Sequence, residues 1–245
     1  MSGHSKWNNI KNKKEKSDAK KAKIFTKMGR EIAVAAKSGG ANPDTNGRLK
    51  DAIAKARSYN MPNDNIARVI AKAAGEQNTA NNEDIVYEGY GPNGVAVLVE
   101  TLTDNRNRTA GDMRHYFDKC GGNLGQNGCV TFMFDEKGVI LIDKNSADED
   151  SVMMDALDAG ADDFSAEEDD FYEITTSPQT FSEVREALVG KGYSFESAEV
   201  MKIPQTTVEL SDELDIKNMN KLIDMLDDND DVQNVYHNWD MPEEE

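Results

Sequence analysis

The chain has 245 residues, of which 38% are hydrophobic, 30% charged and 7% aromatic. These values suit one large folded domain or two to three small ones, and they argue against a wholly disordered chain. The net charge of −18 disfavours nucleic acid as a partner when the chain is taken as a whole.

Three amphipathic helices are predicted in the first third of the chain. Apolar residues recur at three- and four-residue steps from Ile24 to Ala36, and again around Ile53 and around Ile66. The run 38–40 stops the first helix near Lys37, Pro62 separates the second from the third, and a polar linker follows Gly75. Residues 24–75 therefore read as a small helical bundle.

After residue 82, the apolar residues recur at every second position instead of at helical spacing. Segments 85–88 and 95–100 alternate on either side of a glycine-rich turn, which predicts a β-hairpin. A helix with Met113 and Phe117 on its buried face follows and ends at Gly121–Gly122. This region is a strand–strand–helix unit.

The next region begins with a second apparent hairpin, in which a strand over 130–134 turns at 135–138 and returns over 139–142. We then expect a helix over 152–159, a strand over 171–175, a helix over 178–191 and a strand over 194–203. Such a succession is typical of a ferredoxin-like α/β sandwich.

The last region predicts a strand over 206–210, a helix over 214–226 and a strand over 232–239. This unit cannot bury both of its faces alone, so we expect it to complete the unit at 84–128. The predicted fold class is α+β and multi-domain, with an N-terminal three-helix domain and two ferredoxin-like α/β domains. The predicted domains are 1–80, then 81–128 together with 205–245 as a discontinuous middle domain, and the inserted 129–204.

Candidate sites for enzyme chemistry are weak. Gly89-x-Gly91-x-x-Gly94 matches the dinucleotide fingerprint, but a strand follows it instead of the helix that would receive a pyrophosphate. Two cysteines nine residues apart and three dispersed histidines fit neither a zinc site nor a histidine-based triad. We therefore expect no enzyme activity, no cofactor, no metal and no small-molecule substrate.

Acidic clusters follow position 147, and one of them spans residues 227–231. None has the alternating ligands and central glycine of a calcium loop. We interpret them as solvated faces and loops that keep the body of the protein off nucleic acid.

The distribution of charge points to a binding function. Residues 1–75 carry 17 Lys and Arg against 6 Asp and Glu, a net of +11, whereas the remainder carries 11 against 40, a net of −29. A lysine-rich segment can neutralise several phosphates, and Trp7 offers a plane on which an unpaired base could stack. The alternative is a solubilising lysine tail with Trp7 packed into the core.

A polar loop over 103–109 precedes the helix that contains Met113. An Asn or Asp of this loop suits a helix cap, while Arg106 and Arg108 could hold a phosphate near the exposed N–H groups of the first turn. The predicted nucleic-acid-binding residues are His4, Lys6, Trp7, Lys11, Lys13, Lys14, Lys20, Lys21, Lys23, Lys27 and Arg30, with Arg106 and Arg108 as a second contact.

Short runs along the whole chain resemble the bacterial YebC family. They are Gly3–Trp7, Lys23–Lys27, Asn60–Pro62, Tyr87–Pro92, Leu102–Thr109 and Asp230–Asn238. The resemblance implies a cytoplasmic, non-enzymatic, three-domain regulator of gene expression, either a DNA-binding transcriptional regulator or a translation factor.

Two functions follow from this resemblance. In one, the protein binds duplex DNA at promoters. In the other, it binds ribosomal or transfer RNA at the ribosome and relieves stalled elongation. Lysine dominates the basic helix. A lysine ammonium is a point charge that positions a protein on phosphates more than it specifies a base sequence. Sequence readout in duplex DNA is therefore the less supported of the two functions. No membrane partner is expected, because no run reaches the roughly 18–20 apolar residues of a bilayer span and no export signal opens the chain.

Overall fold

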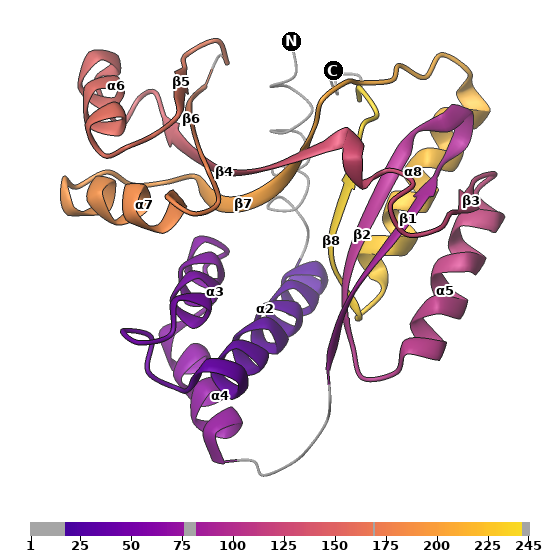
Figure 1. Cartoon of the computed structure of the whole chain (residues 1–245), viewed down its shortest axis with the longest axis horizontal. Coiled ribbons are helices and arrows are strands. Elements are labelled where there is room, and N and C mark those ends of the chain that lie inside the picture. The colour runs from indigo at the N-terminus through magenta and orange to yellow at the C-terminus, as the bar shows by residue number, and fades with distance from the viewer. Residues whose placement is uncertain (1–17, 76–81, 169, 242–245) are drawn as a thin grey trace.

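The computed structural model describes residues 18–75, 82–168 and 170–241, without the side chains of residues 18–20. Figure 1 shows a helical part that lies below one sheet and beside another. No helix in the described ranges is both long and apolar enough to cross a membrane.

The N-terminal part is a three-helix bundle formed by α2 (Asp18–Gly39), α3 (Gly47–Ser58) and α4 (Asn63–Gly75). Ile32 and Leu49 lie fully buried at its centre. The Asn46 side chain caps α3 by accepting from Leu49 N, and it also donates to Ala35 O and Gly40 O. The sharp turn between α2 and α3 is thereby fixed by one side chain.

The middle domain is built on a sheet with strand order β3-β1-β2-β8. Its elements are β1 (Glu83–Tyr90), η1 (Pro92–Gly94), β2 (Ala96–Thr103), α5 (Arg106–Lys119), β3 (Asn123–Leu124), α8 (Glu213–Asp228) and β8 (Val232–His237). β8 pairs antiparallel with β2, so that Val99 faces Val235 across the ladder. This pairing confirms that the middle domain is discontinuous in sequence, while the residue boundaries of the domains stay predictions.

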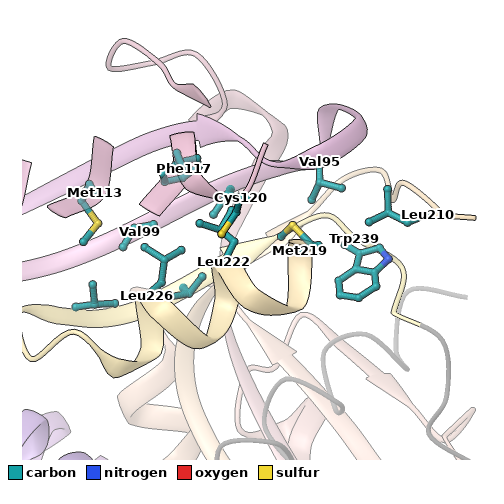
Figure 2. Packing of buried hydrophobic residues seen from close by; sticks show 13 residues of the cluster. Val95, Val99, Met113, Phe117, Cys120, Leu210, Met219, Leu222, Leu226 and Trp239 are labelled. Carbon is teal, nitrogen blue, oxygen red and sulfur yellow. The ribbon is translucent and has the colours of Figure 1, made fainter. Parts of the chain in front are cut away.

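Strand β2 is buried on both faces. Val97 and Val99, together with Val95 just before the strand, join the cluster formed with α5 and α8, in which Phe117 and Trp239 also lie (Figure 2). Ala96 and Leu98 point the other way and pack with Val130, Phe134 and Tyr236 where the inserted domain begins. The two-residue period therefore lets one strand hold two cores together.

The inserted domain has the order β5-β6-β4-β7. Its elements are η2 (Thr131–Met133), β4 (Phe134–Asp143), α6 (Glu149–Asp158), β5 (Asp163–Ser165), β6 (Phe171–Thr176), α7 (Phe181–Gly190) and β7 (Ser197–Pro204). All neighbouring strands run antiparallel. The succession β-α-β-β-α-β in this order confirms the predicted ferredoxin-like arrangement.

The predicted hairpin over 130–142 is wrong in both its first strand and its turn, because η2 occupies 131–133. Residues Phe134–Asp143 form one strand, and its ladder to β7 continues through Asp135↔Ile203 and Gly138↔Val200. Gly138 is required by close packing, because a Cβ atom there would collide with Thr176 and Phe181. A glycine in a polar run is typical of a turn. Gly138 instead lies inside a strand, where it permits the close approach of a neighbouring strand and helix.

Two further differences concern short strands. The segment predicted as a strand over 206–210 makes only an isolated bridge, between Val208 and Trp239. The three-residue strand β5 was not predicted, because so short a segment has no measurable period. The glycine-rich turn, by contrast, does join two antiparallel strands, which confirms the hairpin interpretation of the dinucleotide-like motif.

Candidate nucleic-acid interface

The predicted binding residues fall into three groups. His4, Lys6, Trp7, Lys11, Lys13 and Lys14 lie outside the described residues, and Lys20 lies in α2 with its side chain outside them. Lys21, Lys23, Lys27 and Arg30 follow on α2, and Arg106 and Arg108 lie in the first turn of α5. Lys21 and Arg106 are exposed.

Three of the α2 cations lie on one face of the helix and contact a single acidic segment. Lys23, Lys27 and Arg30 are spaced at i, i+4 and i+7, which places them in a row. Opposite them lie residues 227–231, the acidic segment. This segment covers the end of α8 and the turn into β8. The predicted binding face of α2 is thus occupied within the chain.

The contacts of this row are direct. Lys23 Nζ lies 3.0 Å from Asp228 Oδ1 and 3.1 Å from Asp228 O. Lys27 Nζ donates to Asp227 O at 2.7 Å, and Lys27 is only 8% exposed. Arg30 Nη1 donates to Asp230 O at 3.0 Å and to Leu102 O at 3.1 Å.

The end of α8 is strongly negative for a local reason. A helix C-terminus carries unpaired carbonyls and the negative end of the macrodipole. The last turns of α8 add Asp224, Asp227 and Asp228 and contain no basic residue. The two α2 lysines supply from outside the cations that the helix itself lacks.

Asp231 joins α2 to α5. Its carboxylate accepts from Arg30 Nη1 at 3.0 Å, Arg108 Nη2 at 2.7 Å, Thr109 Oγ1 at 2.8 Å and Thr103 Oγ1 at 3.2 Å. Burial alone would raise the pKa of Asp231, but the hydrogen bonds from Arg108, Thr109 and Arg30 outweigh it and hold the pKa below its usual value. Asp231 is therefore an ionised, buried hub.

Side chains of the loop before α5 cap that helix and bind Arg108, which is part of the Asp231 hub. Asn105 caps α5 by accepting from Arg108 N, which confirms the predicted capping role. The Arg108 guanidinium bonds Asp104 as well as Asp231. Arg108 is therefore ion-paired within the chain, while Arg106 next to it faces solvent.

A second junction ties the helical part to the inserted domain. Tyr59 donates to Glu199 Oε1 on β7 at 2.9 Å, and Lys55 Nζ lies 3.2 Å from Glu31 Oε2. Burial alone would lower the pKa of Lys55, but Glu31 and Glu199 reverse this effect and raise it, so the ammonium stays charged.

A cavity of about 240 Å³ lies between these junctions. Cations of α2 and α3 meet aspartates of α8 around it, and residues of β8 complete its wall. In the described ranges, no group of three His, Cys, Asp or Glu side chains is placed to hold a metal ion.

The interpretation of residues 227–231 as a solvated acidic loop holds only in part, because Asp228 and Asp230 are exposed as expected but Asp231 is not. Asp231 is 4% exposed, and the segment is bound by cations that precede it by about 200 residues. The matching spacing of Lys23, Lys27 and Arg30 was visible in the sequence. Nothing in the sequence, however, joined that row to one acidic cluster rather than another.

The chain matches known proteins along its whole length. A family model described as the TACO1/YebC protein N-terminal domain matches residues 5–76, and one described as the TACO1/YebC second and third domain matches residues 82–239.

Relatives named "probable transcriptional regulatory protein" cover almost the entire chain. One from Acetivibrio thermocellus is 63% identical over 240 residues, which are 98% of this chain and 99% of that protein. One from Caldicellulosiruptor saccharolyticus is 61% identical over 244 residues, 99% of this chain and 100% of that protein. A crystal structure of a conserved hypothetical protein from Aquifex aeolicus superposes with a TM-score of 0.83 at 43% identity and covers 98% of both chains.

Proposed function

The chain belongs to the TACO1/YebC family, and on that premise we propose that it is a non-enzymatic regulator of gene expression that binds nucleic acid through its basic N-terminal part. The observation that carries the proposal is the charge asymmetry, a net of +11 in residues 1–75 beside −29 in the remainder. Such a footprint is typical of a protein that holds phosphates at one end and repels them elsewhere.

The proposed contacts come before the row that binds the acidic segment. Lysines on that stretch attract phosphates, and His4 and Trp7 near its start contact bases. The lysines concerned are Lys6, Lys11, Lys13, Lys14, Lys20 and Lys21. Arg106 is the proposed second contact, because its side chain is exposed while that of Arg108 is engaged by Asp231.

Regulation of transcription fits the names of the relatives. The second candidate is a factor that binds ribosomal or transfer RNA at the ribosome and assists elongation. A lysine-rich stretch with one tryptophan favours it, because stacking on an unpaired base needs a single strand or a loop.

The first experiment is crosslinking in living cells, followed by sequencing of both the DNA and the RNA recovered with the protein. The control is a Lys11/Lys13/Lys14→Ala variant. Recovery of ribosomal and transfer RNA that the variant loses identifies a translation factor. Discrete promoter DNA without RNA enrichment identifies a transcriptional regulator. Recovery that is the same for both proteins contradicts the proposed interface.

A binding titration tests the same interface in vitro. If about six phosphates are engaged, the logarithm of the affinity falls with the logarithm of the salt concentration at a slope of about −4 to −5. An affinity for a labelled RNA hairpin and for duplex DNA that does not depend on salt would defeat the proposal.

A further inference from the structure

The α2 row of Lys23, Lys27 and Arg30 has the spacing and charge of a phosphate-binding face, yet it is covered. Each cation is held by an oxygen of the acidic segment, either a carboxylate or a main-chain carbonyl. A nucleic-acid strand would offer the same row a succession of anionic oxygens.

The two ends of this row differ in strength. The pair Lys23–Asp228 is exposed, with 44% and 66% of the two side chains accessible, and such pairs are weak and screened by salt. Arg30 and Asp231 are 29% and 5% accessible and belong to the hub that includes Arg108. The contact can therefore open from the Lys23 end while the hub stays closed.

We infer that the acidic segment is an internal competitor of nucleic acid, which occupies the α2 row as a phosphate backbone would and yields the exposed end of the row, at Lys23, when a strand binds. This inference rests on the proposed function and adds a way in which nucleic-acid binding is regulated. A strand that lies along α2 displaces Asp228 from Lys23 only if it supplies enough phosphates. Short or weakly charged ligands leave the contact closed.

The competition has a consequence for selectivity. A strand that displaces the acidic segment exchanges one set of anions for another, so fewer counterions are released than the number of cations suggests. The acidic segment thus lowers affinity for any polyanion and favours ligands that span the whole basic surface.

The test compares two doubly neutralised variants with the same net charge. Asp227→Asn/Asp228→Asn removes the carboxylate that pairs with Lys23 and the negative charge next to it, while the main-chain carbonyl of Asp227 that accepts from Lys27 stays. Asp118→Asn/Glu209→Gln neutralises two exposed carboxylates on α5 and before α8. Binding to a fluorescein-labelled RNA hairpin and to duplex DNA is measured by anisotropy between about 50 and 200 mM salt. The first variant should bind about three- to tenfold more tightly than wild type, and the control less than about twofold. The salt slope of the first variant should also steepen by about 1 to 2.

A second comparison separates competition from simple repulsion. In a Lys23→Ala background, Asp228→Asn should no longer raise affinity, because the row has lost the cation that Asp228 holds. If Asp228 acted only by repelling phosphates, its neutralisation would help equally in both backgrounds. Hydrogen exchange in a peptide spanning residues 224–232 should also accelerate when RNA binds to the wild-type protein.

The outcomes distinguish the two proposals. Wild-type protein that binds neither probe at about 50 mM salt contradicts the proposed function itself. Wild-type protein that binds, together with an Asp227→Asn/Asp228→Asn variant that behaves like its control, contradicts the internal competition alone. Hydrogen exchange over residues 224–232 that does not change when RNA binds also contradicts the internal competition.

Discussion

The Arg108 guanidinium lies 2.7 Å from the Asp231 carboxylate, although 123 residues separate the two in sequence. Arg108 lies in the first turn of α5, and Asp231 stands between α8 and β8. Because Asp231 also binds Arg30 of α2, one buried carboxylate fixes the meeting point of the helical part and both halves of the middle domain.

Loss of this carboxylate should destabilise the protein strongly. Asp231→Ala leaves Arg30, Arg108 and two threonine hydroxyls without their shared acceptor, and breaking a buried ion pair costs about 3 to 5 kcal/mol. Urea denaturation followed by circular dichroism measures the loss. Asp228→Ala is the matched control, since its exposed pair with Lys23 is worth less than about 1 kcal/mol. Equal losses in the two variants would show that the hub has no special role.

The contribution of Asp231 should depend on pH in a defined direction. Its pKa is lowered in the folded state, so its stabilisation is complete above the unfolded pKa of about 3.9 and is lost as the pH falls through the lower folded value. The difference in unfolding free energy between wild type and Asp231→Asn should be constant from about pH 6 to 8 and narrow below about pH 4. A difference that widens on acidification would contradict the assignment.

Gly138→Ala should destabilise the inserted domain by about 1 to 3 kcal/mol, because the added methyl group meets Thr176 and Phe181. Gly111→Ala provides the control. Gly111 lies inside α5 with open space around its Cβ position, so alanine there should stabilise by about 0.5 to 1 kcal/mol through helix propensity. Thermal unfolding of the two variants should therefore shift in opposite directions.

Tyr59→Phe should loosen the junction between α3 and β7. The phenol donates to Glu199, and burial together with the charge of Glu199 raises its pKa, so it remains a donor into the alkaline range. Removing this donor should cost about 1 to 2 kcal/mol, because a buried acceptor is left underbonded. Hydrogen exchange in peptides that span α3 and β7 gives a second readout, and unchanged exchange with unchanged stability would contradict this role.

Trp7→Ala tests the proposed base contact. If the ring stacks on an unpaired base, single-stranded RNA should bind more weakly by about 1 to 3 kcal/mol while duplex DNA is little affected. Trp7→Phe should retain most of the affinity, since it keeps an aromatic face. No loss of affinity for single-stranded RNA would assign Trp7 to packing within the protein.

The sequence by itself determined the elements that carry a strong period. The helical spacing around Ile32, Ile53 and Ile66, and the alternation on either side of Gly91, reflect which side of each element faces a core, and this is a local property. The unit around β8 could be joined to β1 and β2 because neither segment can bury its apolar faces alone. The continuous strand through Gly138 was missed, since a glycine that permits close packing has the same local signature as one in a turn.

Only the tertiary structure decided what the basic row of α2 contacts. Charge acts through space, and any of several acidic clusters satisfies the sequence equally well as a partner for Lys23, Lys27 and Arg30. The choice of residues 227–231 follows from the pairing of β8 with β2, which brings the end of α8 beside α2. The sequence thus specified that this face is cationic, and the fold specified that the protein's own acidic segment binds it.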